Sequence, residues 1–192
     1  MNKIDYPIII KKVLPDSLFL SIRDEFKYTG WRLTNYSYSN GKDSNERVSW
    51  RLNEPNNKLL FQKCGSIIKL KLQKHLRQNL NLIRVHSNGN TFGQSTRFHI
   101  DFKNNDVWTF ILFTEIDWNT QWGGEFVVYD PICQEYRYVP YIPNSGALIP
   151  SNWEHYGAAP NEMTDNLRTT LAFSYSSSLD MVKQNDIVRY FL

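Results

Sequence analysis

The stretch "STRFHIDFKNNDVWTFILF", Ser95 to Phe113, decides the fold. Its second part, Val107 to Phe113, is an apolar run of the length of a buried β-strand. Just before that run, His99 and Asp101 stand two residues apart, with apolar residues between and around them. Side chains two apart in an extended chain point to the same side. The stretch therefore predicts an imidazole and a carboxylate that project together from a segment of a buried sheet.

Short β-strands separated by breaks rich in glycine and asparagine fill the chain after Leu80. The breaks include "SNGN", "KNND", "WGG" and "IPNSG". Eight short strands without intervening helices favour a two-sheet jelly roll over a βαβ fold. The candidate strands are residues 82–86, 98–101, 108–114, 125–129, 135–139, 147–149, 154–158 and 168–176.

The first part of the chain is predicted to be mainly helical. After a short strand in "YPIIIKKVL", one helix begins at Pro15 and ends near Tyr28, and a longer one runs from Pro55 to about Leu80. The lysines of the longer helix lie largely off its apolar stripe, which is typical of a solvated helix face rather than of a nucleic-acid patch. Between the helices, residues 34–54 are rich in Ser, Asn and Gly and predict a mobile loop that could border a substrate site.

The predicted fold class is α+β, mainly β, with a double-stranded β-helix (jelly-roll) core and N-terminal helices packed on its major sheet. We expect a single domain over residues 1–192. Within it, residues 1–80 give helical support, 81–178 form the core, and 179–192 are a C-terminal extension.

Composition fits a protein that folds in water. Of the 192 residues, 41% are hydrophobic and 21% charged, and the net charge of +3 is too small a bias to indicate a nucleic-acid partner. Cys64 and Cys133 form no ligand pattern and are expected to be reduced thiols. No apolar run approaches the roughly 20 residues that span a bilayer, and no signal peptide is expected. These features predict a cytoplasmic protein without a membrane partner.

A third candidate ligand, His155, lies in "SNWEHYG" on a separate predicted strand. His99 and Asp101 alone are weak evidence for a metal site, because a surface histidine and a turn aspartate can produce the same sequence pattern by chance. Two imidazoles and one carboxylate, however, are the ligand set of non-haem Fe(II) oxygenases, which leave coordination positions open. Zinc is the alternative metal and usually keeps a single open position.

The last predicted strand, "RTTLAFSY", adds a cation beside these ligands. Arg168 and Thr170 alternate onto one face, while Leu171 and Phe173 take the other. A guanidinium fork and a nearby hydroxyl suit a carboxylate ligand. The competing interpretation is an internal salt bridge from Arg168 to Glu125 or Glu154.

Taken in order, "HID", "WGGEF", "NSGALIP", "EHYG" and "RTTLAF" make the sequence similar to the Fe(II)/2-oxoglutarate-dependent dioxygenases, in particular the prolyl 4-hydroxylase-like branch. The resemblance covers residues 82 to about 175. It implies that His99, Asp101 and His155 bind Fe(II) and are the catalytic residues. Arg168 and Thr170 would hold the distal carboxylate of the co-substrate 2-oxoglutarate.

The resemblance also implies further roles. His86 stands in the region where many relatives place a residue that contacts 2-oxoglutarate, and Arg84 lies two residues before it on the same strand face. Residues 122–125 of "WGGEF" are expected to be structural. Dioxygen would be the oxidant and ascorbate an auxiliary reductant. Asp101 favours hydroxylation, because halogenating relatives lack this carboxylate.

The substrate is predicted less sharply than the chemistry. Peptidyl proline is favoured, since aromatic-lined grooves suit extended proline-containing peptides, and a free amino acid or small metabolite is the alternative. A nucleobase-demethylating enzyme is a third choice that should show a stronger basic groove. The alternative outside the enzymes is a catalytically silent jelly-roll binding module that holds zinc or no metal.

Overall fold

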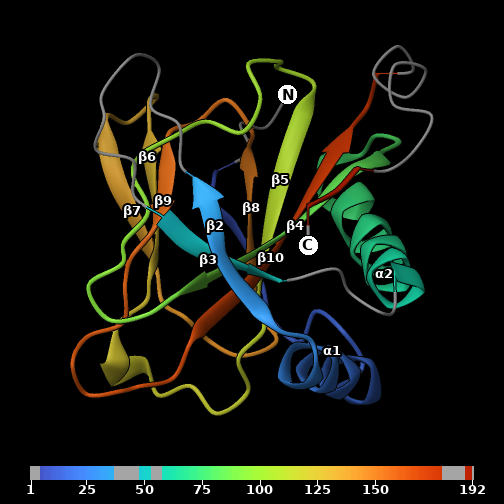
Figure 1. Ribbon diagram of the computed structural model, residues 1–192. Helices are drawn as coiled ribbons and strands as arrows, with labels where there is room; N and C mark the ends of the chain where they lie inside the picture. Colours follow the sequence, from blue (N-terminus) through green and yellow to red (C-terminus); the bar gives the residue numbers. More distant parts are fainter. Residues whose placement is uncertain (1–4, 37–47, 53–57, 179–188, 192) are drawn as a thin grey trace.

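The computed structural model describes residues 5–36, 48–52, 58–178 and 189–191 (Figure 1). Within these ranges the chain forms two α-helices, a short 3-10 helix and eleven β-strands. In chain order the elements are β1 (Ile8–Ile10), α1 (Asp16–Tyr28), β2 (Trp31–Tyr36), β3 (Val48–Leu52), α2 (Lys58–Leu76), β4 (Asn81–Asn90), β5 (Val107–Phe113), η1 (Thr120–Trp122), β6 (Phe126–Asp130), β7 (Glu135–Val139), β8 (Gly146–Pro150), β9 (His155–Gly157), β10 (Arg168–Ser176) and β11 (Arg189–Phe191).

The strands form two facing sheets. The larger sheet has eight strands in the order β1-β8-β5-β10-β4-β3-β2, with β11 also paired to β4, and the smaller has the order β7-β6-β9. Every pairing of named strands is antiparallel except that of β11 with β4. In Figure 1 the smaller sheet lies to the left of the larger one and both helices lie to its right. This arrangement confirms the predicted jelly-roll core with helices on the major sheet.

The central strands of the larger sheet are buried on both faces, and each face has its own partner. Along β10, Leu171, Phe173 and Tyr175 pack with α1 and α2 in one apolar cluster. Ala172 belongs to a second cluster that lies between the two sheets. Because side chains alternate along a strand, one sequence serves both interiors.

The helices bury the stripes that their sequences predict. On α1, buried positions include Leu18, Ile22 and Phe26, four residues apart, and on α2 the buried residues include Ile68 and Leu72. The predicted start of the second helix at residue 55 falls outside the described residues.

Two sequence-based predictions are wrong. Residues 98–101 form no strand, and only His99 makes an isolated bridge, to His155. The backbone of this segment divides its hydrogen bonds between two partners, since Asp101 N–H donates to the Ser151 carbonyl (2.9 Å) instead.

The predicted loop over residues 34–54 is also wrong in part. It contains the end of β2 and all of β3, which pair with each other. Trp50 and Leu52 carry the strand signal that the surrounding polar residues obscured. The rest of the segment lies outside the described residues, so its role as a lid stays a prediction, as does the division of the chain into support, core and extension.

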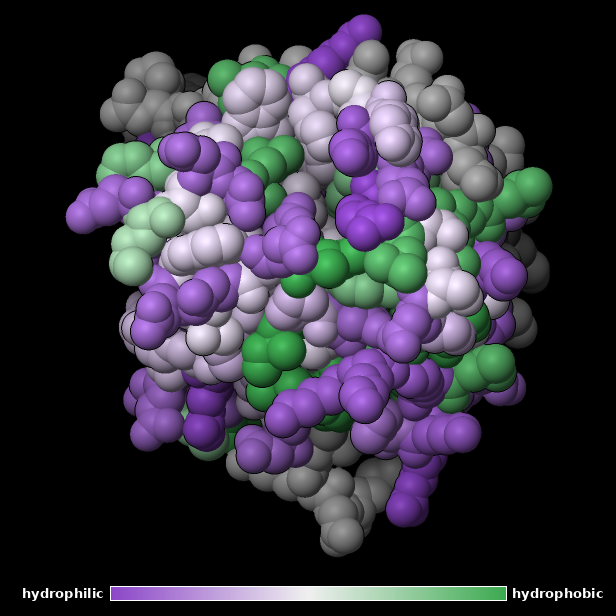
Figure 2. Space-filling view, turned by 90° about the horizontal axis from the view of Figure 1, so that it is seen from below, coloured by the Kyte–Doolittle hydropathy of each residue, from purple (hydrophilic) through white to green (hydrophobic). Residues whose placement is uncertain are grey.

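Neither described helix is long and apolar enough to cross a membrane. Figure 2 shows polar and apolar side chains interspersed over one face of the molecule. Cys64 is buried, Cys133 is exposed, and both are free thiols as predicted.

The contact between β8 and β5 gives a test of the packing. A Cβ at Gly146 would lie 2.4 Å from the backbone oxygen of Ile111 and 2.5 Å from the ring of Phe110. Backbone cannot step aside cheaply, so Gly146→Ala should lower the free energy of unfolding by about 1–3 kcal/mol. Gly30→Ala is the matched control, since a Cβ there meets nothing within 4 Å. Urea unfolding curves measure both, and equal midpoints would contradict the packing described.

Candidate metal centre

Two segments of the chain hold the three predicted ligands. His155 is the first residue of β9, and His99 and Asp101 lie in the segment before β5. The His99 and His155 backbones exchange two hydrogen bonds of 3.0 Å each, which fixes the two segments side by side. The sequence therefore brings together residues 56 positions apart through a single β-bridge.

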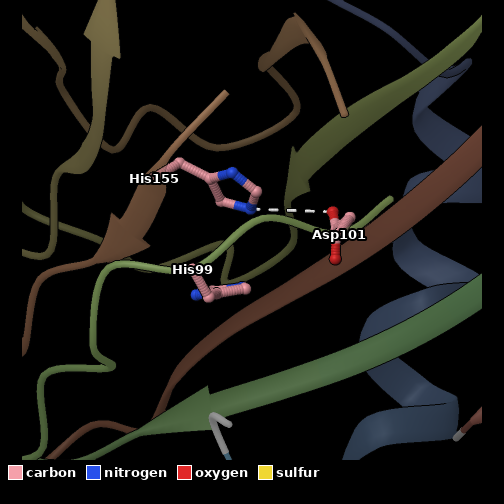
Figure 3. A group of neighbouring side chains, drawn as sticks. All are labelled: His99, Asp101 and His155. Atoms are coloured by element: carbon pink, nitrogen blue, oxygen red, sulfur yellow. Dashed lines mark ion pairs between the residues drawn. The ribbon is translucent and has the colours of Figure 1, made fainter. Parts of the chain in front are cut away.

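The ligand atoms of the three side chains converge. One ligand atom from each of His99, Asp101 and His155 lies within 4.8 Å of the others. His155 Nε2 is 3.6 Å from Asp101 Oδ2, the contact drawn in Figure 3, and the two imidazole rings are 4.5 Å apart between centroids. This spacing is what three groups around one ion require.

Both imidazoles are oriented by their Nδ1 atoms. His99 Nδ1 lies 2.8 Å from the Arg97 carbonyl, and His155 Nδ1 lies 2.9 Å from the Trp153 carbonyl. A carbonyl only accepts, so each Nδ1 carries a proton and Nε2 is the nitrogen left to face an ion. Metal-ligating histidines are typically held in this way.

Asp101 is held as an anion. The Arg84 guanidinium donates to Oδ1, and the Thr109 hydroxyl donates to Oδ2 at 2.8 Å. Burial alone would raise the pKa of this carboxyl, but Arg84 and the two neighbouring histidines hold the pKa well below its usual range. Asp101 is thus ionised and fixed in orientation before any ion binds.

The buried histidines are neutral near pH 7. Burial, with repulsion from His99, lowers the pKa of His155 to about 4. Burial and the charge of Arg84 lower the pKa of His86 to about 3. A neutral imidazole is the form that binds a metal, so His155 needs no deprotonation to act as a ligand.

One cavity of about 210 Å³ connects this cluster to the last strand, β10. All six residues singled out from the sequence line it: His86, His99, Asp101, His155, Arg168 and Thr170. Sequence reasoning missed Asn88 and Asn90, which also line it. The signal was present in the alternation of Arg84, His86, Asn88 and Asn90 on one face of β4.

Arg168 is a buried cation at the other end of the cavity. It is 2% exposed, its Nε donates to the Gly124 carbonyl at 2.6 Å, and its Nη1 donates to Asn90 Oδ1 at 3.3 Å. The guanidinium carbon lies 5.3 Å from the centre of the Tyr141 ring. Nη2 is buried and has no hydrogen-bond partner among the described residues.

The internal salt bridge considered for Arg168 is not found. Among the described residues neither Glu125 nor Glu154 forms an ion pair with it, although Tyr141 and Glu125 are near enough to oppose the lowering of its pKa by burial. Burial dominates and lowers the pKa of Arg168 to about 10, so the side chain remains a cation at neutral pH. A buried guanidinium with a free N–H donor calls for an anion.

The glycines of "WGGEF" have backbone roles, as expected. Gly123 and Gly124 adopt φ angles of 74° and 78°. A Cβ at Gly124 would come within 3.0 Å of Arg168 Cδ. Gly124 therefore also makes room for Arg168, a role that the sequence did not reveal.

Comparison with known proteins places the fold. No protein-family model matches the sequence, and no curated protein matches it. Solved structures do match. An oxidoreductase of the 2OG-Fe(II) oxygenase family from Burkholderia pseudomallei has a TM-score of 0.68 at 13% identity, covering 89% of this chain and 85% of that one.

Two further structures were solved with ligands. A prolyl hydroxylase from Trichoplax adhaerens, in complex with a peptide fragment of the hypoxia inducible factor oxygen degradation domain, has a TM-score of 0.67 at 15% identity, covering 88% of this chain and 83% of that one. HygX from Streptomyces hygroscopicus, with nickel, 2-oxoglutarate and hygromycin B bound, has a TM-score of 0.64 at 10% identity, covering 90% and 83%. The chain thus has the fold of the 2OG-Fe(II) oxygenases, as the resemblance predicted.

Removing a ligand tests the metal centre. His99→Ala and His155→Ala should each weaken Mn(II) binding by more than about 100-fold, beyond the loss typical for residues that only orient a ligand. Asp101→Ala should do the same and also lower stability, because it leaves the Arg84 charge unpaired. Calorimetric titration measures the affinity. His75→Ala on the exposed face of α2 is the control, and a histidine variant that binds Mn(II) like it is not a ligand.

Proposed function

We propose that this protein is an Fe(II)- and 2-oxoglutarate-dependent dioxygenase that hydroxylates an organic substrate and decarboxylates 2-oxoglutarate to succinate. One observation carries the proposal. The buried Arg168, whose Nη2 has no hydrogen-bond partner in the described part of the chain, lines the same cavity as the converging His99, Asp101 and His155.

The ligand set fits a ferrous ion. Two imidazole nitrogens and one carboxylate oxygen suit Fe(II) with positions left open for co-substrate and dioxygen. The neutral His155 and the ionised Asp101 are in the protonation states that binding needs, and the Nδ1 contacts leave Nε2 of both histidines toward the ion. We assign His99, Asp101 and His155 to the metal on these grounds.

The far end of the cavity fits the distal carboxylate of 2-oxoglutarate. We assign Arg168 and Thr170 to this group, since both line the cavity and alternate onto one face of β10. A charge-assisted hydrogen bond from Nη2 would satisfy a nitrogen of the Arg168 guanidinium that lacks a partner among the described residues. We also assign His86, which pairs with Ala172 across β4 and β10, to a contact with 2-oxoglutarate.

When bound, the ferrous ion supplies the activation of dioxygen that is coupled to decarboxylation. The chain's own residues orient the bound groups and shield them from water. Arg84 and Thr109 fix the Asp101 carboxylate. Ile111, Phe126 and Ala172 give the cavity apolar walls that limit entry of water.

We propose a peptide containing proline as the preferred substrate. The structural similarity to a prolyl hydroxylase solved with a peptide supports it. So does a group of partly exposed aromatic rings next to His99, in which Phe98 lies 4.5 Å from Tyr156 and 5.5 Å from Tyr136. The similarity to HygX, solved with hygromycin B, supports the alternative of a small molecule. Ascorbate as reductant and a cytoplasmic location are also proposed, the latter on the two free thiols.

Anaerobic titration tests the activity directly. Fe(II) and 2-oxoglutarate together should give a weak visible charge-transfer band that neither gives alone, and air should then yield succinate. Binding of zinc with no such band and no succinate would identify a silent metal-binding module instead.

Arg168 separates co-substrate binding from metal binding. Arg168→Ala should raise the 2-oxoglutarate requirement roughly thirty- to several-thousand-fold, because removing the partner of a buried carboxylate costs about 2–5 kcal/mol. Arg168→Lys should fall between, since lysine keeps the charge without the planar fork. Saturation curves and melting temperatures are measured on both variants. A destabilised variant with wild-type saturation would remove Arg168 from the site.

Gly157 gives an independent test of the proposed contact between Arg168 and 2-oxoglutarate. A Cβ there would lie 3.0 Å from Arg168 Nη1 and 3.4 Å from Cζ and Nη2. Gly157→Ala should therefore shift the guanidinium and raise the KM for 2-oxoglutarate about tenfold, or ~1.4 kcal/mol. Mn(II) affinity should change little. Gly30→Ala is again the control, and an unchanged KM in Gly157→Ala would mean that the guanidinium position is not critical.

A further inference from the structure

The cavity is lined by a second guanidinium, that of Arg84, whose assigned role so far is to hold Asp101. Arg84 comes from β4, and its side chain is 17% exposed. It ion-pairs with Asp101 and lies 4.7 Å over the ring of Phe102. Its Nε is buried and has no hydrogen-bond partner among the described residues.

Arg84 leaves the loaded cavity with excess positive charge. Among the lining side chains, two guanidinium groups, those of Arg84 and Arg168, face one carboxylate, that of Asp101. A divalent metal and the dianion of 2-oxoglutarate would cancel each other. One positive charge would then remain in a partly buried site, and Arg51 adds a further positive influence at His86. Such a charge is stable only with a counter-ion.

The backbone of Arg84 is also displaced along the sheet from that of Arg168. On β10 its partner is Ser174, six residues beyond Arg168. At about 3.3 Å per residue the two register positions are roughly 20 Å apart along the strand. The two guanidinium groups therefore reach the cavity from different points along the sheet.

We propose that Arg84 binds a carboxylate of the substrate beside the metal centre. This inference rests on the proposed function and narrows its substrate to an acid. The carboxylate belongs either to a free amino acid or small acid, or to an Asp or Glu next to the reacting residue of a peptide. Arginine suits this double task, because its five N–H donors can serve Asp101 and a second carboxylate at once.

Matched acid and amide probes test the proposal without turnover. The protein is loaded with Mn(II) in place of Fe(II) and with saturating 2-oxoglutarate, and binding is measured by calorimetry. The pairs are L-proline and L-prolinamide, L-leucine and L-leucinamide, and the blocked peptides acetyl-Ala-Pro-Glu-amide and acetyl-Ala-Pro-Gln-amide. At least one acid should bind at least about thirty-fold more tightly than its amide partner, as expected for a charge-assisted contact. The pair that does so identifies the source of the carboxylate.

Variants assign the preference to Arg84. Arg84→Gln should bring the acid-to-amide affinity ratio close to one, and Arg84→Lys should retain part of it. Because Arg84 also holds Asp101, these variants are expected to bind Mn(II) more weakly. The comparison is therefore the ratio within each protein at saturating Mn(II). Arg23→Gln on α1 removes an equal charge far from the cavity and should leave the ratio unchanged.

Three other outcomes would contradict either the proposed role of Arg84 or the proposed function. A ratio near one in every wild-type pair, or no binding by any acid, overturns the proposal even if Arg84→Gln fails to load. A wild-type preference that persists in loaded Arg84→Gln shows that Arg84 only holds Asp101. Failure of 2-oxoglutarate to bind the Mn(II)-loaded protein, measured first, would instead overturn the proposed function.

Discussion

The buried Arg168 guanidinium is the constraint around which the interior is arranged. It is 2% exposed and makes no ion pair among the described residues, so the fold must hold a positive charge out of water without a carboxylate. It does so by surrounding the charge with weaker acceptors: the Gly124 carbonyl, Asn90 Oδ1 and the face of Tyr141. These contacts satisfy part of the guanidinium and leave Nη2 for a ligand. A fully satisfied arginine would be more stable but would have little left for binding.

The buried polar groups of this site cost stability, and the other face of the same strands offsets that cost. Leu171, Phe173 and Tyr175 are fully buried against α1 and α2 on one side of β10, while Arg168 and Thr170 face the cavity on the other. Burial of large apolar side chains offsets the cost of polar groups in the interior. A one-residue slip of β10 would exchange the two faces. The register with β4 and β5 therefore determines both the core and the site.

Local patterns explain which parts could be predicted from the sequence. Strands β5, β7 and β10 and helix α1 are strongly periodic or continuously apolar, and they were found within a residue or two. The ligand set and Arg168 carry chemistry that few other patterns share, and the structure brings them to one cavity. The two wrong predictions have different causes. Segment 98–101 divides its hydrogen bonds between His155 and Ser151, which are distant in the chain, whereas the strand signal of β3, paired with the nearby β2, is obscured by the polar residues around it.

Asp101 connects the candidate metal centre to Arg84. Its Oδ2 faces His155 and accepts from Thr109, while its Oδ1 accepts from Arg84. A carboxylate that shared its charge with a metal ion would neutralise Arg84 less completely than it does alone. Loading the site would thus strengthen the field of Arg84 on any neighbouring anion. With Arg84 as the proposed site for a substrate carboxylate, this electrostatic coupling predicts that the metal binds first and the acidic substrate afterwards, since the subsite becomes most positive once Asp101 is engaged.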